Sequence, residues 1–136
     1  MDFGFFNDSL AIISGAIPGA LMRFYITEWS KKRWGVNFPY GTFIINISGC
    51  LLIGFFLTFY STAANLPKEL DLLARTGFLG SYTTFSTYEW ETIFLWRQKE
   101  MATTVFYYLG SAVIGIGSVY LGDSLARFLI GVQGQG

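Results

Sequence analysis

Four stretches of mainly apolar residues, separated by short polar connections, dominate the sequence. They cover about residues 5–27, 41–60, 70–96 and 103–121. Each is long enough to cross a bilayer as a helix, which takes about 20 mostly apolar residues. Residues 9–22, and the second and fourth stretches, contain no charged side chain. The pattern predicts an all-α integral membrane protein with four transmembrane helices, forming a single domain over residues 1–136.

The third stretch differs from the others because its centre is polar. Residues 81–87 are mostly hydroxyl side chains, and Gly77 and Gly80 precede them. Glycine, β-branched and hydroxyl residues together weaken a helix locally. We therefore expect a break in this helix near Gly80–Phe85, with a second half from about Phe85 onward. A plain kink at the glycines is the alternative.

Charged residues concentrate in the expected connections. These are Glu28, Lys31, Lys32 and Arg33 in the first, Lys68, Glu69 and Asp71 in the second, and Arg97, Lys99 and Glu100 in the third. Four spans place both termini on one side of the membrane. Together with their flanks, the first and third connections carry more Lys and Arg than the opposite side, which mildly favours external termini. The bias is small enough to permit insertion in both orientations.

The composition excludes several classes of function. Charged residues make up 13% of the chain, against about 25% in typical soluble domains. The formal net charge is zero, so we expect no nucleic-acid partner. The absence of histidine removes the usual general base and metal ligand. The single cysteine, Cys50, is expected to be a small packing residue, and the acidic N-terminus predicts no cleaved signal peptide.

A few polar residues fall inside the spans. Asn46 lies in the middle of the second span and shares a helix face with Thr42, Gly49 and Cys50. A buried amide in a membrane either joins two helices or serves a functional pathway. In the fourth span Tyr107, Ser111, Gly115 and Ser118 form one stripe, whose hydroxyls either pack against a neighbouring helix or replace the hydration shell of a small anion.

The expected break in the third span has its own chemistry. Carbonyls near Gly80 and Thr83 suit a cation, whereas the amide end of the second half suits an anion. Phe85 and Tyr88 lie one turn apart beyond the break, and their ring edges either line an anion path or simply pack. Glu89 and Glu91 follow them, and we expect both to face an aqueous mouth.

Two arginines lie toward the ends of spans. Arg23 ends the first span, and Arg75 is near the start of the third. Each either attracts anions at a vestibule or reaches the lipid headgroups.

Two segments carry a family resemblance. GTFIINISGCLLIG (residues 41–54) and RTGFLGSYTTFSTYEWE (residues 75–91) resemble the two signature segments of the Fluc (CrcB-type) fluoride channels. The length and the four-span layout match as well. The resemblance implies an antiparallel, dual-topology homodimer with two narrow fluoride pores. It also implies a structural sodium ion held by the backbone carbonyls of Gly80 and Thr83.

The resemblance also assigns roles to side chains. Asn46 would donate to fluoride, and Phe85 and Tyr88 would form an aromatic box. The implied fluoride-pore residues are Arg23, Thr42, Asn46, Phe85, Ser86, Thr87, Tyr88, Tyr107 and Ser111. The second box aromatic is usually Phe in this family. The hydroxyl of Tyr88 therefore either donates to fluoride or requires another partner.

The expected function is passive fluoride efflux across the cell (inner or plasma) membrane, which reduces fluoride toxicity. The expected partners are fluoride, a second copy of the chain and membrane lipid. The sequence has no GxxxxGK[ST] motif for ATP. A proton-coupled small multidrug exporter is a rival, but the first span lacks its buried acid. An intramembrane serine protease would lack its histidine, so we expect no enzyme. An assembly subunit without ion flux is the third rival.

Overall fold

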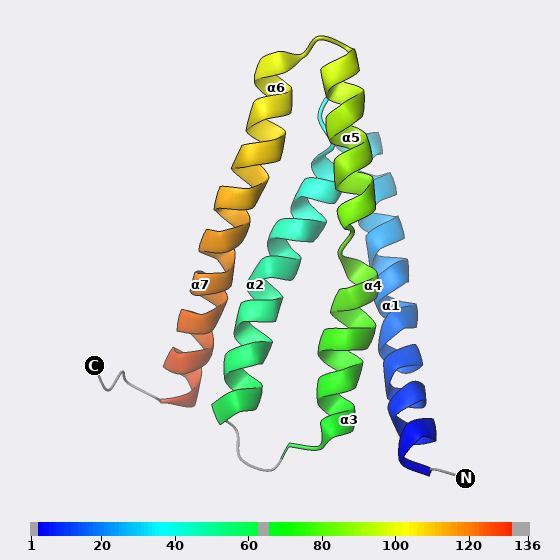
Figure 1. Cartoon of the computed structure of the whole chain (residues 1–136), viewed down its shortest axis with the longest axis vertical. Coiled ribbons are helices and arrows are strands. Elements are labelled where there is room, and N and C mark those ends of the chain that lie inside the picture. The colour runs from blue at the N-terminus through cyan, green and yellow to red at the C-terminus, as the bar shows by residue number, and fades with distance from the viewer. Residues whose placement is uncertain (1–2, 63–65, 132–136) are drawn as a thin grey trace.

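The computed structural model describes residues 3–62 and 66–131, and the regular structure in them is helical. Four passes run alternately up and down (Figure 1). They are α1 (Phe3–Trp34), α2 (Tyr40–Thr62), a third pass from α3 (Lys68–Asp71) to α5 (Phe85–Arg97), and a fourth from α6 (Met101–Val105) to α7 (Ser111–Ile130). The start of α1 and the end of α7 lie at the same end of the molecule, opposite the α5–α6 connection.

Among the residues that the structure describes, three helices are long and apolar enough to cross a membrane: Gly4–Trp34, Tyr40–Thr62 and Met101–Ile130. With the interrupted third pass between them, they form a multi-pass membrane protein. The sequence predicts charged residues in the first two connections, and this is partly wrong. The helix α1 continues through Lys31 and Arg33, and α3 contains Lys68 and Asp71. Helices extend beyond the hydrocarbon core, where long basic side chains reach water from the last turn.

The third pass leaves the helical conformation at two threonines. Its first half comprises α3, the π-helical η1 (Leu72–Leu79) and α4 (Gly80–Tyr82). Thr83 and Thr84 are extended, with ψ angles of 159° and 120°, and α5 begins at the next residue. The first half therefore runs through Gly80 and ends just after it.

The fourth pass contains a π-helical stretch, η2 (Phe106–Gly110), between α6 and α7. A π-helical turn holds one residue more than an α-helical turn. The stripe expected from regular spacing therefore does not continue unchanged along this pass. The hydroxyl of Ser118 donates to the carbonyl of Ile114 in its own helix (2.9 Å), so this member of the stripe is locally satisfied.

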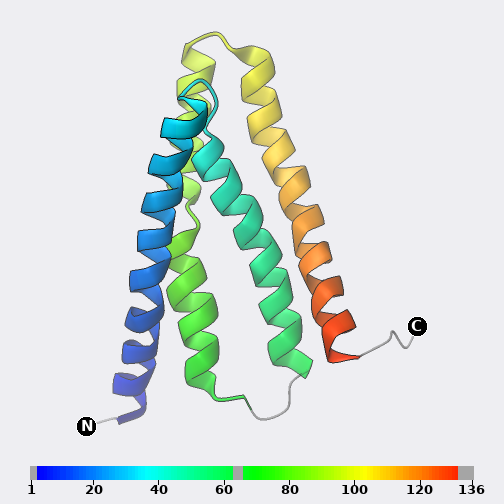
Figure 2. The same cartoon turned by 180° about the vertical axis from the view of Figure 1, so that it is seen from behind.

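The passes pack in two pairs: α1 lies along η1 and α4, and α2 lies along α7 (Figure 2). The α2–α7 contact requires a glycine at position 122. A Cβ atom there would overlap the backbone oxygen of Leu51 on α2. Small residues of this kind let membrane helices approach closely.

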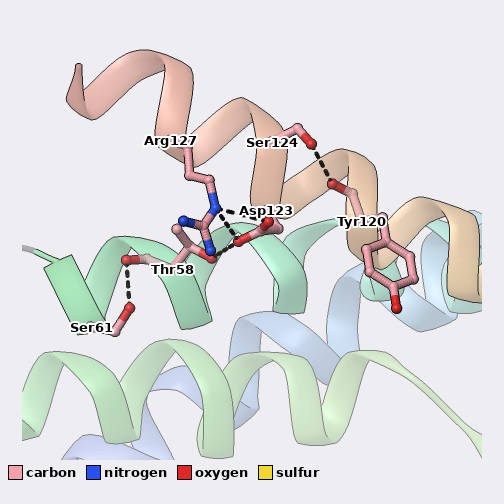
Figure 3. Close-up of polar contacts among 6 residues, drawn as sticks. All are labelled: Thr58, Ser61, Tyr120, Asp123, Ser124 and Arg127. Carbon is pink, nitrogen blue, oxygen red and sulfur yellow. Dashed lines mark hydrogen bonds and ion pairs between the residues drawn. The ribbon is translucent and has the colours of Figure 1, made fainter. Parts of the chain in front are cut away.

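Polar side chains join α2 and α7 near the ends of both helices (Figure 3). The hydroxyl of Thr58 donates to the carboxylate of Asp123, which also pairs with Arg127 at 3.0 Å. The hydroxyls of Ser61 and Ser124 donate to carbonyls of their own helices. The charges in this cluster are therefore mutually paired, and the cluster fastens the two helices together.

Candidate functional site

The interruption in the third pass is held by the side chain of Asn46. Its Nδ2 donates to the carbonyl of Thr84 (2.9 Å), and the Thr84 amide donates to its Oδ1 (3.0 Å). These bonds supply part of the pairing that an extended backbone inside a membrane protein needs. Asn46 therefore joins α2 to the third pass. Since an amide nitrogen carries two hydrogens, one N–H of Asn46 is left for a further partner.

The interruption removes the helical donors of several backbone carbonyls, and those of Gly80 and Thr83 are two of them. In a continuous helix the amides of Thr84 and Thr87 would bond to the carbonyls of Gly80 and Thr83. Here the Thr84 amide bonds to Asn46, and the Thr87 amide bonds to the hydroxyl of Thr84 (3.3 Å). The carbonyl of Gly80 therefore lacks a backbone donor, and that of Thr83 is free to accept from the guanidinium of Arg23.

Arg23 and Gly49 both lie against Thr83. The Nη1 of Arg23 is 3.5 Å from the Thr83 carbonyl oxygen. A Cβ atom at position 49 would overlap the methyl group of Thr83, so this glycine lets α2 approach the extended residues. Arg23 thus contacts the protein at the interruption. The sequence analysis considered only a vestibule or the lipid headgroups for this side chain. Arg75 likewise has a protein partner, the carboxylate of Asp71.

Three hydroxyls cluster at the start of α5. The Oγ1 of Thr84, which precedes the helix, lies 2.9 Å from the Oγ1 of Thr87 and 3.5 Å from the Oγ of Ser86. Thr84 acts as the N-cap by accepting a bond from the Thr87 amide. The cluster therefore lies at the end of α5 where the helix dipole favours negative charge.

Two hollows meet beside the interruption. One, of about 340 Å³, is lined by Asn46, Phe85, Tyr88 and Ser111, among others. The other, of about 400 Å³, is lined by residues that include Asn46, Cys50, Gly80, Thr83, Arg75 and Phe85. Asn46 and Phe85 line both hollows. The side chain of Phe85 is 73% exposed in the single chain, so its ring projects from the helices that carry it.

Ser111 has an unusual environment in the first of these hollows. Its Oγ is buried and, within the described residues, has no hydrogen-bond partner. A buried hydroxyl without a partner loses its hydration and gains nothing in return, which costs about 1–3 kcal/mol. Such a group is therefore a candidate donor to a ligand.

The hydroxyl of Tyr88 has a partner within the protein. It donates to the backbone carbonyl of Tyr108 at 2.6 Å, and the two rings are stacked with centroids 5.7 Å apart. The ring of Tyr107 is also close, with its centroid 5.2 Å from that of Tyr88. From the sequence, this hydroxyl either donates to fluoride or requires another partner. The structure gives it another partner, the carbonyl of Tyr108.

Glu91 lies in a half-buried polar triad with Thr42 and Tyr107, and the expectation that it faces an aqueous mouth stays a prediction. Thr42 donates to its Oε1 (3.0 Å), and Tyr107, whose side chain is fully buried, donates to its Oε2 (2.8 Å). A further hollow of about 250 Å³ begins at the α1–α2 connection and reaches Thr42 and Glu91. Glu89, for which we expected the same, lines the hollow that contains Ser111.

Sequence reasoning missed Glu91, Thr84 and the backbone carbonyl of Tyr108 that accepts the bond from Tyr88. A capping rule identifies Thr84, since a threonine before a helix whose hydroxyl reaches the amide three residues later is a common N-cap. No local signal identifies the other two. The partners of Glu91 are 49 and 16 residues away along the chain, and the bond to Tyr108 uses a backbone atom.

Within residues 3–62 and 66–131, no group of three or more His, Cys, Asp or Glu side chains could hold a metal ion. The backbone carbonyls of Gly80 and Thr83, which lack their helical donors, are oxygen atoms that a cation can use. Carbonyls of unwound helices are the ligands that membrane proteins offer to sodium.

Comparison with known proteins gives a consistent result. Residues 10–123 match the family described as CrcB-like protein, Camphor Resistance (CrcB). A protein of Synechococcus sp. named "Fluoride-specific ion channel FluC" is 49% identical over 117 residues, which cover 86% of this chain and 90% of that protein. Proteins of the same name from Synechocystis sp. and Trichormus variabilis are 49% and 44% identical, over 88% and 87% of this chain and 92% and 87% of their own lengths.

Proposed function

Since the chain belongs to the CrcB-like protein family, we propose that it is a fluoride-selective channel through which the anion leaves the cell passively. The relatives that cover most of the chain are named as ion channels and not as enzymes. The channel operates in the cell (inner or plasma) membrane. Fluoride enters a cell as neutral hydrofluoric acid under acidic conditions and ionises inside, so a passive path relieves its accumulation.

The observation that carries this proposal is the buried hydroxyl of Ser111. It has no hydrogen-bond partner in the part of the chain that the structure describes, and it lines the same hollow as Asn46, Phe85 and Tyr88. Fluoride is small and strongly hydrated, so its path must offer donors that replace water. The Ser111 hydroxyl and the remaining N–H of Asn46 are two such donors.

The aromatic rings complete the path at this point. A ring is positive at its edge, so Phe85 and Tyr88 attract an anion without a fixed charge. A formal positive charge would hold the ion too tightly for rapid release. In this hollow fluoride therefore passes a series of weak, neutral contacts.

The remaining pore residues lie on either side of this hollow. Ser86 and Thr87 supply hydroxyls at the start of α5, and Arg23 adds positive charge beside Thr83. On the other side, Tyr107 and Thr42 both donate to Glu91. Each hydroxyl can donate to fluoride only if it gives up its bond to Glu91. Passage of fluoride at this point therefore requires the side chains of the triad to rearrange.

The channel is an antiparallel homodimer with two pores. The exposed ring of Phe85 and the open hollow beside Gly80 and Thr83 call for a covering surface, and a second copy in the opposite orientation provides it. The small bias in Lys and Arg between the two sides supports insertion in both orientations. Each copy then contributes the same residues to the shared interface.

A structural sodium ion fits the carbonyls of Gly80 and Thr83. Both lack helical donors, and both line the same open hollow. One chain offers two such oxygens, and the second copy offers the same two again. A hard cation there would neutralise the partial negative charge at the end of α4 and fasten the two copies together.

Fluoride efflux from liposomes tests the proposal. Liposomes containing the pure protein are loaded with potassium fluoride, valinomycin is added, and a fluoride electrode records release. We expect release well above that from protein-free liposomes, and much slower release of chloride under the same conditions. Fluoride retention equal to that of protein-free liposomes would overturn the proposal.

A further inference from the structure

Tyr88 connects α5 to the π-helical stretch of the fourth pass. Its hydroxyl donates to the backbone carbonyl of Tyr108 at 2.6 Å, and Tyr108 lies in the middle of η2. The two rings are stacked, with an interplanar angle of 10°. The side chain of Tyr88 is buried, so bulk water does not compete with Tyr108 for its hydroxyl.

The π-helical stretch determines which way the fourth pass presents its polar residues. One extra residue in a turn rotates everything that follows by about 100°, the angle per residue of an α-helix. Tyr107 lies within the stretch and bonds to Glu91 on α5. Ser111 is the first residue after the π-helical stretch and lines the hollow beside Phe85. If the stretch returned to an α-helix, Tyr107 could not face Glu91 while Ser111 faces the hollow beside Phe85.

π-helical turns are less stable than α-helical ones and persist where other groups support them. Side chains that bond to a helix carbonyl are one such support. Tyr88 supplies such a bond to η2 from a neighbouring helix. A phenylalanine at position 88 would keep the ring but would have no donor for this carbonyl.

We propose that Tyr88 is a positioning residue, whose hydroxyl holds the π-helical turn at Tyr108 and thereby keeps Ser111 directed into the hollow. Its hydroxyl does not donate to fluoride, and Tyr88 presents only the edge of its ring to the path. The effect on flux rests on the proposed function, whereas the effect on the turn does not.

The test compares Tyr88→Phe with Tyr108→Phe in the full-length protein. Tyr108→Phe is the matched control, because it also removes one hydroxyl but keeps both the stacked ring and the bonded carbonyl. Hydrogen exchange of peptides covering residues 106–115 reports the turn. We expect faster exchange in Tyr88→Phe only. We also expect its fluoride efflux to fall about fivefold, as the loss of one net hydrogen bond implies.

A rescue separates positioning from general destabilisation. Replacing Tyr88 by 4-aminophenylalanine restores an N–H donor at the same place, and we expect it to restore slow exchange and efflux. Equal exchange in Tyr88→Phe and the control would overturn the role in the turn, and efflux unchanged in Tyr88→Phe would overturn the role in conduction. If the wild-type protein releases no fluoride, the proposed function fails, but the exchange comparison still tests the turn.

Discussion

At the scale of single residues, the hydrogen-bond partner of a polar side chain separates structural from functional positions. Ser111 and Ser118 belong to the same stripe in the sequence. The hydroxyl of Ser118 is bonded to its own helix, whereas the buried hydroxyl of Ser111 has no partner among the described residues. The sequence predicts the stripe but cannot distinguish its members, because the difference depends on the turn that precedes them.

Ser111→Ala tests the role of this hydroxyl. We expect fluoride efflux to fall about five- to tenfold, because one donor of about 1 kcal/mol is lost from the path. The melting temperature should stay the same or rise slightly, since no protein bond is broken. Ser118→Ala is the matched control and should conduct normally. Equal efflux from both variants would remove Ser111 from the pathway.

Asn46→Asp tests the amide that holds the interruption. A carboxylate cannot donate to the carbonyl of Thr84, and its charge repels fluoride. We therefore expect efflux to fall to the level of protein-free liposomes. Asn37→Asp makes the same chemical change in the α1–α2 connection and should conduct normally. An Asn46→Asp protein that conducts within about twofold of wild type, a difference of under 0.5 kcal/mol in barrier, would contradict this role.

The sequence identified Asn46 as a candidate because an amide is unusual at membrane depth, whereas the family resemblance assigned Phe85 and Tyr88 to an aromatic box. The sequence did not predict the partners of Glu91, because a charged residue is expected at water unless its partners are known. Its partners, Thr42 and Tyr107, come from two other passes. Such contacts depend on how the helices pack, which no local pattern specifies.

At the scale of elements, hydrophobic length predicted which segments are helical, but their ends and irregular turns were less predictable. The helix α1 extends to Trp34, well beyond its apolar stretch, because basic side chains tolerate the last turns of a helix. The π-helical stretches η1 and η2 have no signature in the sequence. They matter for function because they decide which face of a pass meets the site.

Gly122→Val tests the close contact of α2 and α7. A side chain at this position would overlap the backbone of Leu51, so the helices must separate. We expect a loss of about 1–3 kcal/mol or more in stability, as overpacking of a tight contact implies. The measurement is the melting temperature followed by size-exclusion chromatography. Gly117→Val is the control, since a Cβ atom there meets nothing within 4 Å and should be tolerated.

At the scale of the whole molecule, four passes leave much of the candidate pathway open on one side. Phe85 and the hollow that contains Gly80 and Thr83 lie uncovered in the single chain. A pore for a dehydrated ion must be enclosed, because water competes for every donor. Two copies in opposite orientations would enclose two such pores.

Light scattering of the purified protein tests this assembly. We expect a protein mass of twice the 15.2 kDa of one chain, after correction for bound detergent. Replacing sodium by a large organic cation should promote dissociation, if a bound cation joins the two copies at Gly80 and Thr83. A stable protein with the mass of one chain would contradict the dimer and the two pores together.

The central claim is that neutral donors and ring edges conduct fluoride selectively and without coupling to another ion. The most direct measurement is the reversal potential of the purified protein in a planar bilayer, with a tenfold fluoride gradient and equal chloride on both sides. The account predicts a reversal potential of about 59 mV in magnitude, the value for a tenfold gradient of one monovalent ion. A reversal potential near zero, or no current above that of the lipid alone, would contradict it.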